Sequence, residues 1–342
     1  MPDDVILLAH GSGGKLSHDL VVNLFARYFA NPTLLSLDDS AVLPVEDATQ
    51  GLCLAFSTDS YVISPLFFPG GDIGKLAVCG TVNDVSMRGA RPLWLSAGFV
   101  LEEGLSLATL ERVVASMAAT AERAGVQIVA GDTKVVDRGS ADKVFINTAG
   151  IGVLPWGVEI AGNRARPGDA IIVSGTMGDH GMTILTQREG LQFDSPLESD
   201  CAPLNGLVAC LLDRLQPGVV HAMRDPTRGG LATALVELAL ASNVGIEIEE
   251  GSVPVRDAVR AACELLGLDP LYVANEGKVI AIVEAEAAEA VVDVMRDHEY
   301  GRDAAIIGHV TGAHPGRVVL RTPLGARRIL DMLAGEQLPR IC

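Results

Sequence analysis

The chain has 342 residues, which at roughly 150 residues per domain suggests two domains. Its 26 basic and 43 acidic residues give a net charge of −17, which argues against non-specific binding to nucleic acid or to anionic lipid. The longest uncharged stretch, residues 144–158, is interrupted by glycines and a proline and is too short to span a membrane as a helix. The hydrophobic content of 49% is enough for a sizeable core.

The cysteines and the N-terminus indicate the compartment. The six cysteines form neither a CxxC pair nor a Cys/His pattern typical of zinc sites. The chain begins with acidic residues where a signal peptide would be basic. We therefore expect a cytoplasmic protein whose thiols are reduced.

Short runs rich in Val, Ile and Leu alternate with Ala- and Leu-rich helical stretches, which is the pattern of an α/β protein. After Trp156 the pattern changes, which predicts a domain boundary between about residues 155 and 168. The first half is predicted to contain strands at 34–37, 52–57, 93–101, 126–130 and 144–153, and helices at 15–29, 73–88 and 106–124, the last capped by Gly125. The second half is predicted to contain strands at 170–174, 245–249 and 279–283, and helices at 181–187, 229–242, 285–297 and 326–333.

Aspartates recur beyond the ends of predicted strands. Asp39 follows the first strand, Asp59 follows the second, and Asp132 follows a later one, while Asp84 and Asp225 lie in short polar motifs. Ligands of α/β proteins bind beyond the carboxyl ends of strands, and converging carboxylates suit Mg²⁺, which prefers oxygen ligands. All five are therefore predicted magnesium ligands, although a turn or a helix cap explains any one of them alone.

A glycine-rich loop from His10 to Lys15 opens the first predicted helix. The bare backbone N–H groups of Gly13 and Gly14, together with the Lys15 ammonium, can approach a phosphate. The loop is not a P-loop, because Leu16 stands where Ser or Thr is required. A flexible turn explains the same glycines equally well.

Two lysines flank predicted strands. Lys134 lies beside Asp132, and its compact charge, which suits phosphate, favours a functional role. Lys278 precedes a strand and is expected to be a solvated loop residue. His180 lies between glycines and has two possible explanations. One is an acid/base role or a substrate contact for His180, and the other is that Asp179 caps the next helix; both explain the segment equally well.

The last seven residues, 336–342, end in a cysteine. Extended, this segment would reach roughly 23–25 Å, and Pro339 favours an extended form. A cysteine at a chain end contributes little packing, and Cys342 is not in a prenylation signal, which places the cysteine four residues from the end. A long arm that ends in a nucleophile is typical of a carrier that presents a covalently held group to a pocket.

Taken together, these motifs resemble the hydrogenase maturation carbamoyl dehydratases, the HypE family, within the superfamily typified by aminoimidazole ribonucleotide synthetase. The resemblance implies an α/β fold with mixed α+β sheets. It also implies a nucleotide-binding and dimerisation domain at 1–155, a C-terminal α/β domain at 165–333 and a flexible tail at 334–342. The motifs that carry the resemblance lie at 10–14, 38–41, 57–60, 70–90, 131–134, 178–181, 224–230, 275–278 and 339–342.

The resemblance also implies an activity. A partner carbamoyltransferase places a carbamoyl group on the thiol of Cys342, and ATP drives its dehydration to a thiocyanate. An iron-scaffold maturation complex then receives the cyano group as the cyanide ligand of the [NiFe]-hydrogenase iron. The family further implies a homodimer formed through the N-terminal domains, with ATP bound between the domains.

The resemblance also implies roles for individual residues in this reaction. Mg²⁺ on the five aspartates would orient phosphoryl transfer to the amide oxygen. Glu276 is the candidate base, and Lys134 either pairs with it or stabilises the phosphoryl oxygens. The predicted ATP contacts are Gly13, Gly14, Lys15, Asn83, Asp84, Gly131 and Lys134.

Two alternative functions share parts of this pattern. A non-catalytic scaffold that bears a thiol would show the same tail, and another ATP-dependent synthetase or kinase of the superfamily would share the aspartates. Selenophosphate synthetases carry a cysteine or selenocysteine near the glycine loop, whereas the first cysteine here is Cys53. The thiamine monophosphate kinases and purine-pathway synthetases have no use for a terminal cysteine.

Overall fold

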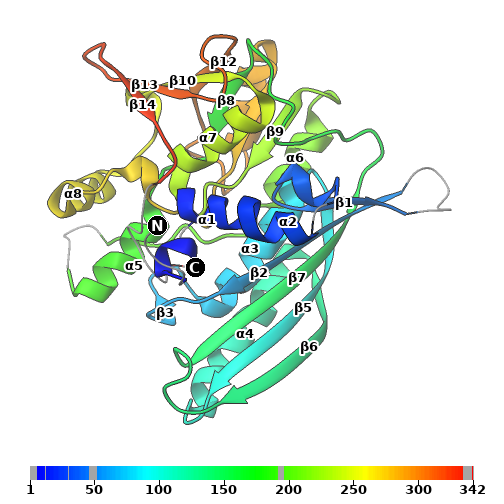
Figure 1. The fold of residues 1–342 in the computed structure, drawn as a ribbon, viewed down its shortest axis with the longest axis vertical. Coiled ribbons are helices and arrows are strands. Elements are labelled where there is room, and N and C mark those ends of the chain that lie inside the picture. Colours follow the sequence, from blue (N-terminus) through cyan, green and yellow to red (C-terminus); the bar gives the residue numbers. More distant parts are fainter. Residues whose placement is uncertain are drawn as a thin grey trace.

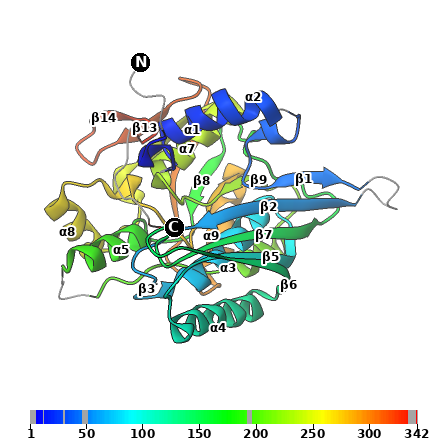
Figure 2. The same cartoon turned by 60° about the horizontal axis from the view of Figure 1, so that its bottom comes forward.

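Two large β-sheets, one in each half of the chain, form the framework of the part of the protein that the structure describes (Figures 1 and 2). The computed structural model describes residues 6–11, 13–29, 31–45, 52–191, 196–333 and 341. The mixed sheets with their flanking helices confirm the predicted α/β class. A small third sheet pairs β3 (Phe67–Phe68) with β4 (Gly71–Asp72).

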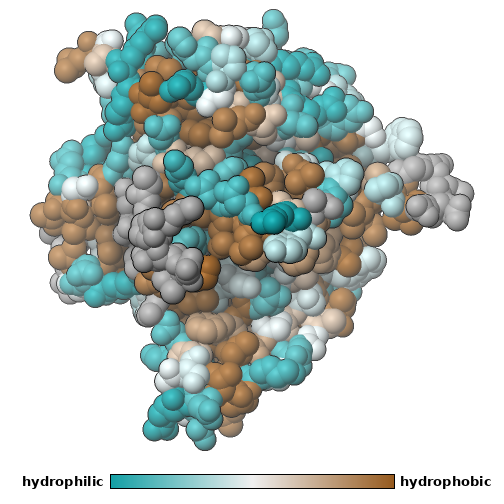
Figure 3. Space-filling model, viewed as in Figure 1, coloured by the Kyte–Doolittle hydropathy of each residue, from teal (hydrophilic) through white to brown (hydrophobic). Residues whose placement is uncertain are grey.

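The first sheet has the strand order β1-β2-β7-β5-β6, and only β5 and β6 run parallel to each other. Two helices pack on one face, and the inner one, α3, is almost wholly buried. Apolar side chains gather on the surface over the strands of this sheet (Figure 3). The bounds are β1 (Ala41–Pro44), β2 (Cys53–Tyr61), β5 (Arg91–Glu102), β6 (Gln127–Val136), β7 (Val144–Leu154), α3 (Ile73–Met87) and α4 (Leu107–Ala124).

The two helices that pack on the first sheet each begin at a polar cap. Asp72 accepts hydrogen bonds from the N–H groups of Gly74 and Lys75 at the start of α3. Ser106 accepts one from Thr109 at the start of α4. Gly125 ends α4 with a left-handed φ of 68°, which confirms the expected C-cap.

The second sheet has the order β14-β13-β10-β12-β8-β11-β9, and apolar clusters lie on both of its faces. Along β8, Ile171 and Val173 face one cluster while Ala170 and Ile172 face the other, which explains why this strand is a continuous apolar run. The strands are β8 (Ala170–Val173), β9 (Val220–Arg224), β10 (Gly245–Glu249), β11 (Ile280–Val283), β12 (Ala305–Thr311), β13 (Val318–Arg321) and β14 (Arg327–Leu330). The helices of this half are α5 (Asp179–Glu189), α6 (Asn205–Arg214), α7 (Gly230–Ser242), α8 (Asp257–Leu266) and α9 (Ala288–Arg296).

The N-terminal helices cross to the second half of the chain and lie beside α7 (Figures 1 and 2). They begin with a 3-10 turn (Leu8–Gly11) and continue as α1 (Lys15–Leu20) and α2 (Ala26–Phe29). A π-helical turn (Val21–Phe25) joins α1 to α2, so the predicted helix at 15–29 is present but irregular.

Two predicted elements are wrong. Residues 34–37, expected as a strand, form a 3-10 helix (Leu34–Ser36) that ends at Leu37 with a left-handed φ of 51°. Residues 326–333, expected as a helix, contain β14, which pairs with β13. Runs this short carry too little periodicity to separate helix from strand, so contacts with distant elements decide.

The remaining predicted helices and strands are present within a few residues, but one boundary matters for function. The strand predicted at 126–130 continues to Val136, so Asp132 and Lys134 lie inside β6 rather than beyond it. Strands and helices that the pattern missed include α6, α8, β9, β12 and β13. In the described parts of the chain, no helix is long and apolar enough to cross a membrane.

Candidate active site

Four of the five predicted aspartates come close enough for their charges to interact. Asp84 on α3 is central: burial, followed by the charges of Asp225, Asp59 and Asp39, raises its pKa well above the usual range. Ser57 donates a hydrogen bond of 2.8 Å to its Oδ2. Burial and the charge of Asp39 raise the pKa of Asp225 to about 8, and its Oδ2 has no hydrogen-bond partner among the described residues. We call these four residues the aspartate cluster.

Two arginines lie beside the aspartate cluster. Arg224 is the last residue of β9, and Arg228 lies in the loop that follows. Arg224 Nε lies 3.3 Å from Asp39 Oδ1, and its Nη2 lies 3.0 Å from Glu237 Oε2. Arg228 Nη2 lies 3.4 Å from Asp59 Oδ1. Burial still raises the pKa of Asp39 to about 6 and raises that of Asp59, so the arginines compensate only part of the crowded negative charge.

Glu276 lies in the loop before β11 with only 3% of its surface exposed. Its Oε1 has no hydrogen-bond partner within the described ranges. Burial, followed by the charges of Cys201 and Asp225, raises its pKa well above the usual range. A carboxyl group in such surroundings is a strong proton acceptor once it is ionised.

A hydrogen-bond network fixes the backbone of this loop. Asn275 Oδ1 accepts a bond of 2.7 Å from Gly178 N–H, and Glu276 N–H donates to Asp200 Oδ1 at 3.1 Å. The other oxygen of Asp200 lies 3.1 Å from Lys278 Nζ, and both side chains are buried. The expectation that Lys278 is a solvated loop residue is therefore wrong.

Asn83 joins the two halves of the chain. Its Nδ2 donates to Ala202 O at 3.1 Å, and its Oδ1 accepts from Leu204 N–H at 2.7 Å. The side chain is fully occupied by these bonds and 1% exposed. Because Asn83 precedes Asp84 on α3, this contact holds the aspartate cluster against the second half.

Two glycines of the glycine-rich loop, Gly13 and Gly14, pack against the second half of the chain. Gly13 has a φ of +74°, and a Cβ there would lie 2.5 Å from Cβ of Arg228. A Cβ on Gly14 would lie 2.2 Å from the carbonyl oxygen of Leu333, which also accepts a bond of 2.9 Å from Lys15 N–H. The close approach requires both glycines. Arg228 links this loop to Asp59 of the aspartate cluster, while the Lys15 side chain is exposed.

Asp132 and Lys134 pair with each other on β6, the outer strand of the first sheet. Lys134 Nζ lies 2.8 Å from Asp132 Oδ2, and the two side chains are 69% and 70% exposed. The hydrogen bond from Lys134 lowers the pKa of Asp132, opposite in direction to the shifts in the aspartate cluster. Lys134 thus pairs with Asp132 and not with Glu276.

The sheet register separates this pair from the aspartate cluster within one chain. Asp59 is opposite Thr148, Thr148 is opposite Ala97, and Ala97 is opposite Gly131. Three strand spacings, roughly 14 Å, therefore lie between Asp59 and Gly131. Carboxylates that share one Mg²⁺ must lie far closer, because each oxygen is about 2 Å from the ion.

Cys342, the predicted carrier, lies outside the described residues, but the residue before it is described. Ile341 is 6% exposed and forms an isolated antiparallel bridge with Ile63. Its carbonyl oxygen lies 2.5 Å from Nε2 of His180. Asp179 makes no side-chain cap at the start of α5, and His180 of the same motif contacts the tail at Ile341.

The aspartate cluster fits a magnesium ion that arrives with phosphates. Among the described residues, no three His, Cys, Asp or Glu side chains form a ready metal site. The cluster nevertheless offers carboxylate oxygens in a region of excess negative charge, and one of them, on Asp225, is buried without a partner. Mg²⁺ commonly binds one or two carboxylates together with phosphate oxygens.

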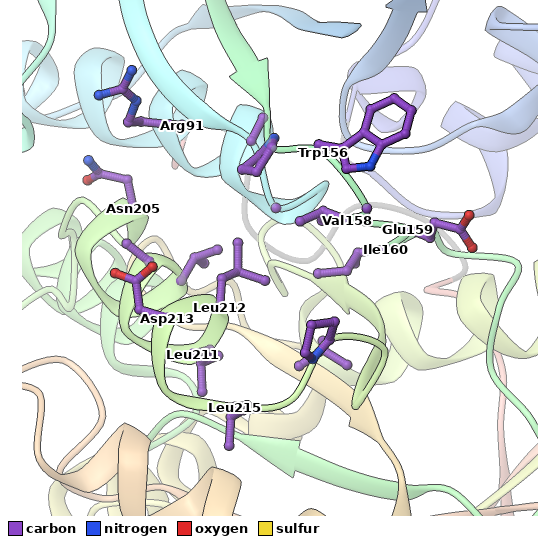
Figure 4. Close-up of a pocket in the computed structure, with 18 of the residues that line it drawn as sticks. Arg91, Trp156, Val158, Glu159, Ile160, Asn205, Leu211, Leu212, Asp213 and Leu215 are labelled. Atoms are coloured by element: carbon purple, nitrogen blue, oxygen red, sulfur yellow. The ribbon is translucent and has the colours of Figure 1, made fainter. Parts of the chain in front are cut away.

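A cavity of about 870 Å³ lies elsewhere, between residues 155–160, α6 and β9 (Figure 4). Its walls are largely apolar, with Ile160, Leu211 and Leu212 among the lining residues. Neither Glu276 nor any member of the aspartate cluster lines it. The candidate active site is therefore the aspartate cluster with Glu276, and not this cavity.

Comparison with known proteins agrees with this fold. Residues 37–154 match the N-terminal domain, and residues 166–321 the C-terminal domain, of AIR synthase related protein. The chain is 54% identical over 335 residues to "Carbamoyl dehydratase HypE" of Azotobacter vinelandii, covering 98% of this chain and 96% of the relative. The chain thus has the two domains that define AIR synthase related proteins.

Solved structures identify the family within the AIR synthase related proteins more closely. A hydrogenase maturation protein HypE in complex with ATP is 56% identical, with a TM-score of 0.82 over 99% of this chain and 100% of the other. A HypE–HypF complex contains a chain that is 49% identical, with a TM-score of 0.86 over 92% of this chain and 99% of that one. This chain belongs to the carbamoyl dehydratase HypE family. It is an enzyme of hydrogenase maturation.

Proposed function

We propose that this chain uses ATP to dehydrate a carbamoyl group on the thiol of Cys342 to a cyano group, for use as the cyanide ligand of the [NiFe]-hydrogenase iron. The observation that carries the proposal is the burial of Ile341, the residue before Cys342, against His180. His180 contacts Ser199, and the next residue, Asp200, accepts the backbone bond from Glu276. The bound end of the tail and the buried carboxyl group are therefore joined through one short segment.

The nucleotide part of the proposal is supported by the HypE relative that was solved with ATP. When bound, ATP supplies the phosphoryl group that turns the amide oxygen into a leaving group, and Mg²⁺ neutralises the phosphates. The aspartate cluster is the site that we assign to Mg²⁺. Lys15, at the exposed end of the glycine loop, is the phosphate contact that we assign to the N-terminal segment.

Glu276 has the properties that the remaining chemistry needs. Conversion of the carbamoyl group to a cyano group removes the oxygen with its phosphoryl group and removes both protons from the nitrogen. A buried carboxylate with a raised pKa takes such protons more readily than an ordinary glutamate. A cation in the neighbouring aspartate cluster favours the ionised form of Glu276, because opposite charge lowers its pKa.

We further propose that Asp132 and Lys134 act in the site of a second copy of this chain. β6 is an edge strand whose side chains are almost all exposed, including Val129 and Val135, which are 60% and 67% exposed. Apolar side chains gather over the same sheet (Figure 3). A long exposed strand with apolar side chains is suited to pairing with another chain. The proposal requires a homodimer in which this sheet brings each Asp132–Lys134 pair to the partner's aspartate cluster.

Partners and compartment follow from the same reaction. The HypE–HypF complex supports a carbamoyltransferase as the protein that loads Cys342, and the product requires an iron-scaffold complex as acceptor. We assign the protein to a reducing cytoplasm, where the thiol of Cys342 stays available for loading. We assign nucleotide binding and dimerisation to residues 1–155 and the base to the second domain, 165–333.

Mass spectrometry of the carbamoylated chain tests this function. The C-terminal peptide, loaded on Cys342 by the carbamoyltransferase, should lose the mass of one water when ATP and Mg²⁺ are added. A non-hydrolysable ATP analogue is the matched control and should leave the carbamoyl group intact. Retention of the carbamoyl group with ATP would show that the chain is a scaffold.

A further inference from the structure

The anchor of the C-terminal tail is built around a fully buried histidine on α5. His180 Nδ1 lies 2.7 Å from Ser199 Oγ, and its Nε2 lies 2.5 Å from the carbonyl oxygen of Ile341. A carbonyl oxygen can only accept, so Nε2 carries the proton and donates it to this bond. In the neutral ring Nδ1 then accepts from the Ser199 hydroxyl.

The surroundings hold the ring in this one tautomer and orientation. Cys201 N–H donates to Ser199 Oγ at 3.1 Å, which leaves the hydroxyl hydrogen to point at the ring. The rings of Phe68 and His180 form a T-shaped pair with centroids 5.6 Å apart and planes at 84°. Burial lowers the pKa of His180, so the neutral form is favoured at neutral pH.

The tail is held at its last residue but one. Ile341 pairs with the backbone of Ile63, and its side chain belongs to the apolar cluster that contains Ile63 and Phe68. His180 adds the directional contact, because a hydrogen bond to a carbonyl fixes the peptide plane that leads to the next residue. The anchor therefore consists of Ile63, Phe68 and His180 around Ile341.

We propose that His180 is a positioning residue that holds the Ile341 carbonyl so that the group on Cys342 stays in the active site during dehydration. This inference rests on the proposed function. His180 acts through the tail and does not touch the reacting atoms. Loading by the partner needs the tail released, so a weaker anchor slows dehydration without slowing loading.

Two substitutions of His180 separate its two hydrogen bonds. In His180→Gln the side-chain amide nitrogen can occupy the place of Nε2 and still donate to Ile341. In His180→Asn the shorter amide reaches the place of Nδ1 and Ser199 but not Ile341. The two variants are similar in polarity and differ in length by one methylene group, and only His180→Gln keeps the donor to Ile341.

The first measurement is the rate at which iodoacetamide alkylates Cys342, followed by mass spectrometry of the C-terminal peptide. We expect alkylation to be about tenfold faster in His180→Asn and within about twofold of the unmodified chain in His180→Gln. Equal rates in the unmodified chain and both variants would overturn the inference. If His180→Asn does not fold, Ser199→Ala serves in its place, with a smaller increase expected and no increase contradicting the inference.

The second measurement compares the single-turnover rate of dehydration with the rate of carbamoyl loading. We expect His180→Asn to lower the dehydration rate, with loading and ATP binding unchanged and with activity retained by His180→Gln. Alkylation needs neither ATP nor a carbamoyl group, so it tests the anchor even if the unmodified chain proves unable to dehydrate. Unchanged dehydration in His180→Asn would contradict the positioning role.

Discussion

Two lysine–aspartate pairs among the described residues have opposite surroundings. The side chains of Lys278 and Asp200 are 11% and 2% exposed, and their charged atoms lie 3.1 Å apart. Those of Lys134 and Asp132 are 69% and 70% exposed, although their charged atoms are closer, at 2.8 Å. Distance alone therefore does not rank the pairs, because water and salt screen the exposed one.

The difference in burial indicates different roles for the two pairs. Asp200 of the buried pair accepts the backbone bond of Glu276, so this pair fixes the candidate base within the chain. The exposed pair lies on an edge strand and adds little to the fold. The role that we propose for it is contact with a second copy of the chain.

The largest expected effect is on the base that the buried pair positions. Glu276→Gln keeps the shape of the side chain but cannot accept a proton, so the dehydration rate should fall by about 10²–10⁴-fold. Glu284→Gln, a change of an exposed carboxylate just beyond β11, is the matched control and should leave the rate unchanged. Single-turnover mass spectrometry measures both, and a near-normal rate in Glu276→Gln would remove this residue from the mechanism.

Removing each lysine should separate stability from activity. Lys278→Met leaves Asp200 buried without its partner and should lower the free energy of unfolding by about 3–5 kcal/mol. Lys134→Met should leave the unfolding curve almost unchanged and still impair dehydration. Urea unfolding and the dehydration assay, applied to both variants, separate the effect on stability from the effect on activity. Equal losses of stability in the two variants would contradict the difference between the buried and the exposed pair.

The aspartate cluster should make stability depend on pH and on Mg²⁺. The pKa of Asp225 is about 8 in the folded chain, against about 4 when unfolded. Between these values the folded chain keeps a proton that the unfolded chain has released, so stability falls as pH rises, by at most about 1.4 kcal/mol per pH unit for this group. Mg²⁺ binds the ionised carboxylates, so its stabilising effect should grow over the same range.

Two variants check the origin of that pH dependence. Asp225→Asn should weaken both the pH dependence and the effect of Mg²⁺, as measured by urea unfolding at about pH 5 and about pH 8. Asp293→Asn should change neither, because Asp293 is an exposed residue of α9 and does not belong to the aspartate cluster. A response to Mg²⁺ that survives in Asp225→Asn would place the ion elsewhere.

The sequence pattern grouped most of the site, although partly for the wrong reason. Asp39, Asp59, Asp84 and Asp225 do gather, but Asp59 lies inside β2 and Asp84 lies on α3. The prediction that these aspartates gather because they follow strand ends is therefore wrong for Asp59 and Asp84. The sequence motifs that carry these residues were the better guide.

Two other site features had no local signal in the sequence. Lys278 sits among residues typical of a loop, and its burial depends on Asp200, which is 78 positions away. His180 owes its role to Ile341, which is 161 positions away. Composition and periodicity describe neighbours along the chain, so they cannot report contacts made between distant segments.

The most direct test of the account mixes two inactive variants, Glu276→Gln and Lys134→Ala, by co-expression. If each site combines Glu276 of one chain with Lys134 of the other, a mixed dimer has one intact site, and random pairing should restore about a quarter of the unmodified dehydration rate. If both residues act within one chain, every site in the mixture lacks one of them. A mixture that stays as inactive as its parents would contradict the account.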